Sequence, residues 1–155
     1  MFKAAVFISL LGLSAVAARA ADTGPHFFAP PGADPKTSPP FSNAVMVDGT
    51  FYVAGHLGLD PATGKAGSDA ETEARLVMDA VKQTLETGGL TMNDLVSVTV
   101  YCTDLDLYDK FNGVYRGYFH EHYPARAFIG VAKLVRGAHF EIAGVAVKSK
   151  TPRKP

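Results

Sequence analysis

The amino-acid sequence predicts an α+β fold in the order β-β-α-β-α-β-β, with both helices on one face of a mixed sheet. Five short apolar runs rich in β-branched residues predict the strands, and two longer segments with apolar residues at helical spacing predict the helices. No internal repeat interrupts this order, so we expect a single domain over residues 44–148.

The first two strands form a predicted hairpin. The apolar runs 44–47 and 50–54 flank Asp48-Gly49, a dipeptide typical of two-residue hairpin turns. Gly55 and His56 follow the second run, and this glycine allows close approach of another group to the backbone.

The first helix is predicted to begin at a capping box, Ser68 to Glu71, and to end at Gly88-Gly89. The next strand is expected over residues 95–102, with Val96, Val98 and Val100 on the same face as Cys102. Cys102 is the only cysteine, which excludes an intramolecular disulfide, and we interpret it as a buried apolar residue.

The second helix is expected to be capped by Asp104 or Asp106 and closed by Pro124. One broad apolar face supports it, made by Leu107, Phe111, Val114, Tyr115, Tyr118 and Phe119. Two final strands follow, over residues 126–131 and 139–147. Several strands are apolar on both faces, while two helices can cover only one, so we expect other copies of the chain to cover the second face.

The regions outside the domain differ from it in composition. Residues 1–20 resemble a signal peptide, with Lys3, an apolar stretch and the small-residue site Ala18-Arg19-Ala20, which predicts export to the periplasm or medium. Residues 21–43 are a Pro-rich arm, and residues 149–155 form a polar tail. Cleavage after Ala20 would leave 13 basic and 15 acidic residues, a net charge of −2, which does not favour nucleic-acid or membrane binding.

Two charged residues stand in otherwise apolar strands. Arg126 follows Pro124-Ala125, and Glu141 follows His139-Phe140. Adjacent strands could bring both into one cavity, where Arg126 would bind a carboxylate and Glu141 would move a proton. From these residues alone, an Arg–Glu ion pair joining two strands is the simpler interpretation.

Several motifs together resemble the Rid (RidA/YjgF) family of reactive-intermediate deaminases. They are Gly49-Thr50-Phe51-Tyr52-Val53-Ala54-Gly55-His56, Asp60-Pro61-Ala62-Thr63-Gly64, Phe111-Asn112-Gly113-Val114-Tyr115, Tyr123-Pro124-Ala125-Arg126 and Gly137-Ala138-His139-Phe140-Glu141-Ile142. The resemblance implies a chorismate-mutase-like homotrimer with ligand clefts between subunits. It also implies hydrolysis of 2-imino acids or enamines, such as 2-aminoacrylate or 2-iminopropanoate, to 2-keto acids and ammonia without a cofactor or metal.

Carried over by position, the resemblance implies that Arg126 binds the substrate carboxylate and that Glu141 positions or activates the attacking water. Gly55 and Asn112 also fall on family site positions, although Asn112 alone could equally be a helix-surface amide. Two cleft positions depart from the family pattern: Phe41 replaces a common tyrosine, and Phe128 replaces a common cysteine. Both changes predict a more apolar pocket.

Three functions remain open at this stage. The first is an exported imine deaminase, a hydrolase. The second is a non-catalytic small-ligand-binding or holdase-type protein, which the loss of the tyrosine hydroxyl and the export signal favour. The third is a ribonuclease, which the net charge disfavours. His120 and His122 lie two residues apart and face different directions, so a metal pair is not expected.

Overall fold

The computed structural model describes residues 24–30, 32–34 and 36–148. The predicted signal peptide and polar tail lie outside these residues, so both stay predictions. Within the described part of the chain, no helix is long and apolar enough to cross a membrane.

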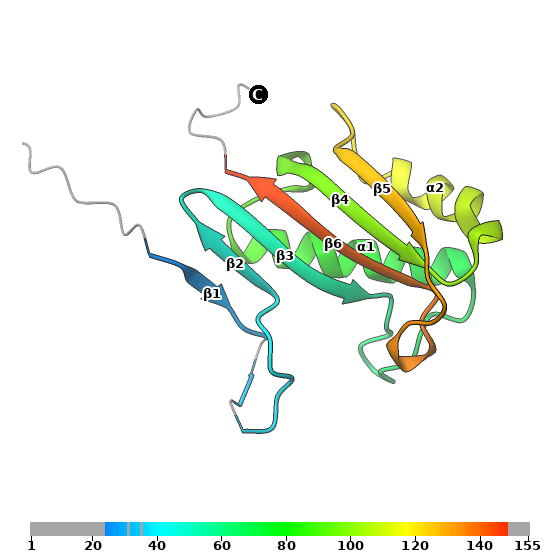
Figure 1. The fold of residues 1–155 in the computed structure, drawn as a ribbon, viewed down its shortest axis with the longest axis horizontal. Helices are drawn as coiled ribbons and strands as arrows, with labels where there is room; N and C mark the ends of the chain where they lie inside the picture. Colours follow the sequence, from blue (N-terminus) through cyan, green and yellow to red (C-terminus); the bar gives the residue numbers. More distant parts are fainter. Residues whose placement is uncertain (1–23, 31, 35, 149–155) are drawn as a thin grey trace, which may run out of the picture.

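Six strands form one mixed sheet in the order β1-β2-β3-β6-β4-β5, and two helices cover one face of it (Figure 1). The strands are β1 (His26–Phe28), β2 (Ala44–Val47), β3 (Thr50–Leu57), β4 (Leu95–Cys102), β5 (Ala125–Gly130) and β6 (Phe140–Val147). The helices are α1 (Ala70–Thr87) and α2 (Tyr108–Arg116), with short 3₁₀ turns at Met92–Asp94, Leu105–Leu107 and Val135–Gly137. Among the described strands, only β4 and β5 pair in parallel. The predicted fold class is confirmed.

The β2–β3 hairpin turns at Asp48 and Gly49, as expected. Both residues have positive φ, 48° and 79°, which matches the right-handed twist of the flanking strands. The Pro-rich arm contributes a strand that the sequence pattern did not reveal: β1 pairs with β2, and the Phe28 ring packs at 5.0 Å from the Phe51 ring.

Both helices differ from the prediction at their ends. The N-cap of α1 is Asp69 and not Ser68, because the Asp69 carboxylate accepts from the backbone N–H groups of Glu71 and Thr72. These hydrogen bonds lower the pKa of Asp69 to about 2. Helix α2 ends at Arg116, well before Pro124, with Gly117 as its C-cap. Phe119 is buried although it lies after the end of the helix. The apolar pattern therefore extends past Arg116, which made the predicted helix too long.

Strand β4 contains a bulge that changes which of its residues face the core. Its register with β6 shifts between Leu95 and Ser97. Leu95 therefore joins Val98, Val100 and Cys102 on the buried face, whereas Val96 is 47% exposed. The expected placement of Val96 on the Cys102 face is wrong, because a bulge adds one residue to the alternation.

The core lies between the sheet and the helices, while the opposite sheet face is open in the single chain. On β6, Phe140, Ile142 and Ala146 are buried, and their alternates Glu141, Ala143 and Val145 are only half-buried. Tyr52, paired with Val145, is 52% exposed. This open apolar face is the surface for which covering copies were predicted.

Candidate functional site

Arg126 lies on β5 and faces α2. It is paired with the buried Val98 of β4, and side chains at paired positions share one face of a sheet. Its Nη2 donates a hydrogen bond of 2.8 Å to Oδ1 of Asn112, which is 8% exposed on α2. Asn112 is therefore not a helix-surface amide, because it orients the Arg126 guanidinium.

Aromatic rings surround the guanidinium of Arg126. Its Cζ lies 4.5 Å from the centroid of the Tyr115 ring, with Phe128 at 5.7 Å and Tyr108 at 5.8 Å. Among the residues that the structure describes, no carboxylate pairs with Arg126. The guanidinium is thus held in place by aromatic stacking and by the Asn112 amide. Its remaining N–H groups lie in one plane and can donate two parallel hydrogen bonds to an anion.

A cavity of about 220 Å³ opens beside this guanidinium. Its lining consists of Tyr108, Asn112, Tyr115, Arg116, Tyr123, Pro124 and Arg126. Burial raises the pKa of the Tyr115 phenol to about 12, although the nearby positive charge of Arg126 works in the opposite direction. The Tyr115 hydroxyl is therefore protonated at neutral pH and can act only as a neutral group.

Glu141 lies on the open face of the sheet. It pairs with Tyr101 on β4 and Leu57 on β3, and it is half-buried. Within the described residues its carboxylate has no hydrogen-bonding or ion-pair partner. A Cβ atom on Gly55 would collide with Oε1 of Glu141, so the glycine provides the space that this carboxylate occupies.

Arg126 and Glu141 do not meet within one chain. Strand β4 lies between β5 and β6, and the two side chains point to opposite faces of the sheet. The prediction that two adjacent strands bring them together is therefore wrong, and so is the alternative of an ion pair within the chain. The order of strands in the sheet, which periodicity does not specify, decides this point.

The two substituted cleft positions have different surroundings. The Phe128 ring packs on the rings of Tyr108 and Phe111, at 4.9 and 5.4 Å, on the Arg126 side. Phe41 is 55% exposed and lies in the loop before β2. The chain therefore presents one half-site with Arg126, Asn112 and Phe128, and another with Gly55 and Glu141.

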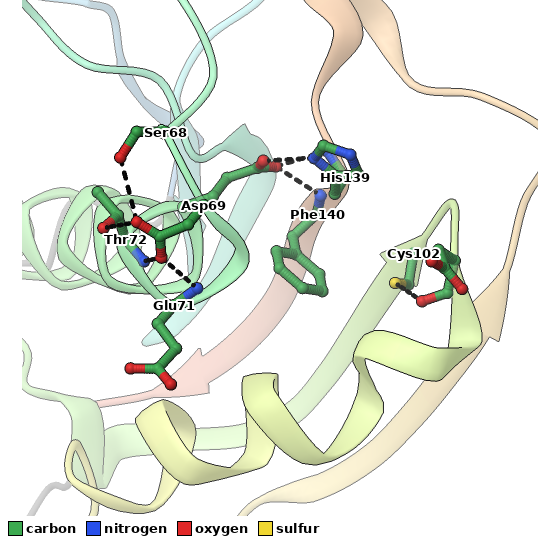
Figure 2. Close-up of polar contacts among 9 residues, drawn as sticks. Ser68, Asp69, Glu71, Thr72, Cys102, His139 and Phe140 are labelled. Atoms are coloured by element: carbon green, nitrogen blue, oxygen red, sulfur yellow. Dashed lines mark hydrogen bonds and ion pairs between the residues drawn. The ribbon is translucent and has the colours of Figure 1, made fainter.

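A buried carboxylate that the sequence analysis did not single out supports the Glu141 strand. Glu73 of α1 is fully buried, and its Oε1 accepts from the backbone N–H groups of His139 (2.5 Å) and Phe140 (2.8 Å). Its Oε2 lies 2.8 Å from His139 Nδ1. Figure 2 shows His139 and Phe140 at the start of β6, with dashed lines marking these contacts. A glutamate at a core-facing helix position was the available signal, because such a residue is rarely buried without partners.

His56 fastens the neighbouring strand to the same helix. Its Nδ1 donates to the Ala54 carbonyl and its Nε2 accepts from the Thr84 hydroxyl, each at 2.7 Å. Burial lowers the pKa of His56, so the ring is neutral at pH 7. His56 is therefore a structural link between β3 and α1.

The described part of the chain contains neither a candidate metal-binding cluster nor a cysteine that favours the thiolate form. No three His, Cys, Asp or Glu side chains gather there in a way that could hold a metal ion. Cys102 is buried as expected, its Sγ donates to the Asp104 carbonyl, and burial raises its pKa, so the thiolate is disfavoured.

The described residues form a small α+β protein with an arginine on its edge strand that no carboxylate in the described residues pairs with. Comparison with known proteins shows the family of the chain. The family model described as endoribonuclease L-PSP matches residues 32–148. A 2-iminobutanoate/2-iminopropanoate deaminase from Bos taurus is 39% identical over 111 residues, which cover 70% of this chain and 80% of the relative.

Two solved structures are similar throughout their length. A putative endoribonuclease from Thermotoga maritima has a TM-score of 0.72 and 38% identity, covering 80% of this chain and 98% of that one. Escherichia coli TdcF with bound serine has a TM-score of 0.68 and 32% identity, covering 72% and 91%. The chain belongs to the Rid (RidA/YjgF) family, the family that the endoribonuclease L-PSP model describes.

Proposed function

We propose that this protein hydrolyses 2-imino acids, or their enamine tautomers, to 2-keto acids and ammonia in a cleft completed by two copies of the chain. The observation that carries the proposal is the Arg126 guanidinium, oriented by Asn112 and by the Tyr115 ring, with no carboxylate partner among the described residues. Relatives named as 2-iminobutanoate/2-iminopropanoate deaminases support the reaction class.

The substrate carboxylate would bind the planar fork of Arg126 through two parallel hydrogen bonds. The cavity of about 220 Å³ beside Arg126 would receive the carboxylate end of the substrate, and a second copy of the chain would complete the cleft around the rest of it.

Glu141 would serve the water. Its carboxylate takes a proton from the water as the water oxygen bonds to C2 of the imine, and passes that proton to the imine nitrogen to form a carbinolamine. Glu141 then takes the proton of the new hydroxyl and passes it to the nitrogen. The C2–N bond breaks, its electron pair leaves with ammonia, and the C2–O bond becomes the keto group. The reaction consumes one water and needs no oxidant, metal or organic cofactor.

Two copies are required because the two half-sites lie on opposite faces of one sheet. The open face that carries Glu141 is also the face that a second copy would cover. We propose a homotrimer, as the family resemblance implies, with Arg126 of one subunit completing the cleft that holds Glu141 of its neighbour.

The direct experiment measures keto-acid release from freshly generated 2-iminopropanoate. The parent protein should accelerate this release, and Arg126→Ala should reduce kcat/KM at least about tenfold, because hydrogen bonds to charged groups contribute ~1.5–3 kcal/mol. Arg126→Lys should recover little, since lysine lacks the planar fork.

Light scattering must show the same assembly for each variant, so that dissociation is not mistaken for loss of chemistry. If the parent binds keto acids without accelerating hydrolysis, the protein is the non-catalytic binding protein instead. The exposed Phe41, which supplies no hydroxyl, favours that second candidate. Cleavage of RNA by the parent but not by Arg126→Ala would contradict both.

A further inference from the structure

Tyr115 carries a buried hydroxyl that nothing in the described chain satisfies. The residue is only 4% exposed, and its phenol oxygen has no hydrogen-bond partner among the described residues. A buried polar group without a partner costs free energy, so such groups are rare unless a ligand or another molecule completes them.

The place of this hydroxyl indicates what completes it. Tyr115 lines the cavity beside Arg126, and the Arg126 guanidinium lies over its ring. The Arg126 Cζ lies 4.5 Å from the centroid of that ring, so the two side chains are close together. An anion bound by Arg126 therefore brings a hydrogen-bond acceptor to the neighbourhood of an unused donor.

Tyr123 lines the same cavity as Tyr115. Its ring is stacked on that of Tyr115 at a centroid distance of 6.4 Å and an interplanar angle of 20°. Unlike Tyr115, Tyr123 is 58% exposed, and it lies between the end of α2 and the start of β5, outside both elements. Because Tyr123 lies outside both elements, its ring can move without unfolding either of them, although it also packs on the Phe119 ring at 5.8 Å.

We propose that the Tyr115 hydroxyl donates a hydrogen bond to the carboxylate of a small 2-oxo or 2-imino acid held by Arg126, with the Tyr123 ring moving aside to admit it. This inference rests on the proposed function only in taking Arg126 as the carboxylate-binding residue. Tyr115 stays protonated through neutral pH, because its pKa is about 12, so it serves as a donor and not as a base. Tyr115 thus supplies a hydroxyl from α2, on the Arg126 side of the cleft, whereas Phe41 has none to supply.

The test is the equilibrium binding of 2-oxobutanoate, a probe that binds without turnover, to the full chain by calorimetry. Tyr115→Phe removes one oxygen atom and should weaken binding about tenfold, the equivalent of ~1.4 kcal/mol. Because the hydroxyl is unpartnered in the free protein, the same variant should keep or raise the Tm.

Tyr118→Phe is the matched control. Its hydroxyl donates to Asp79 Oδ1 at 2.7 Å, outside the cavity, so its loss should lower the Tm and leave 2-oxobutanoate binding unchanged. The opposite responses of the two tyrosines distinguish an unused donor from an ordinary structural one.

The possible failures are separable. If Arg126→Ala abolishes probe binding and Tyr115→Phe does not weaken it, the proposed site stands and the role of Tyr115 is wrong. If Arg126→Ala also binds normally, the proposed site itself is wrong. A clear loss of Tm, or of assembly, in Tyr115→Phe would show that the hydroxyl has a protein partner and would overturn the inference.

Discussion

At the scale of single residues, the site depends on what surrounds each charged group. Arg126 is a cation on an edge strand, held by one amide and by aromatic faces. Glu141 is a carboxylate on the open sheet face, in a space that exists only because Gly55 has no side chain. Each group therefore has its position fixed while its charge remains available.

Gly55 gives the sharpest test at this scale. Gly55→Ala should displace the Glu141 carboxylate, because the added Cβ would collide with it. We expect a loss of kcat close to that of Glu141→Gln, within the ~10²–10⁴ range of general acid–base catalysis. The measurement is 2-iminopropanoate hydrolysis.

Gly113→Ala is the control, because a Cβ there meets nothing within 4 Å and alanine favours the helix. Its activity should equal that of the parent. If Gly55→Ala also retained full activity, the position of the Glu141 carboxylate would not matter to the reaction.

At the scale of elements, α1 is joined to the sheet by buried polar contacts as well as by apolar packing. Glu73 holds the start of β6, directly before Glu141, and Thr84 holds His56 on β3. Both strands that form the Glu141 half-site are thus fixed to one helix, which limits how far that half-site can move.

Removing the Glu73 carboxylate should therefore destabilise the fold. Glu73→Ala leaves the backbone N–H groups of His139 and Phe140 without acceptors. Phe140 is buried, at ~1–3 kcal/mol for an unsatisfied group, whereas His139 is exposed, so we expect a loss of about 2 kcal/mol. Glu73→Gln keeps one acceptor oxygen and should cost less. Urea denaturation measures both.

The comparison variant is Glu71→Ala, which removes only an exposed pair with Arg75 and should change the free energy of unfolding by about 0.5 kcal/mol or less. Equal losses at both positions would contradict the importance of the buried carboxylate.

The elements also show how far the sequence could predict the structure. Local signals were sufficient for the Asp48-Gly49 turn and the limits of β4, because turn chemistry and β-branched runs act over a few residues. They were not sufficient to predict the sheet face on which Val96 lies, because that depends on a bulge in the pairing of β4 with β6. The early end of α2 was missed because Phe119 continues the apolar pattern outside the helix.

The same limit applies to the site. Arg126 and Glu141 were recognisable as charges in apolar strands, but their separation by β4 follows from tertiary strand order. The sequence shows Glu73 only as a glutamate at a core-facing helix position. Neither its partners nor the unpartnered Tyr115 hydroxyl could be predicted, since whether a polar atom finds a partner depends on contacts between residues far apart in the sequence.

At the scale of the whole molecule, one chain presents two incomplete half-sites and an open apolar sheet face. A second copy that covers this face would place its own edge strand near the Glu141 half-site. The proposed activity and the proposed assembly are therefore one claim, because neither half-site contains both the carboxylate-binding group and the group that serves the water.

The measurement that tests this claim most directly combines two inactive variants. Arg126→Ala and Glu141→Gln chains, each with a different affinity tag, are co-expressed, and assemblies that carry both tags are isolated and assayed for 2-iminopropanoate hydrolysis. Sites shared between neighbouring copies predict recovery of roughly a third of the parent activity for a trimer, or about half for a dimer, since each mixed assembly regains one intact cleft. Activity that stays at the level of the single variants, in assemblies shown to contain both chains, would contradict the account.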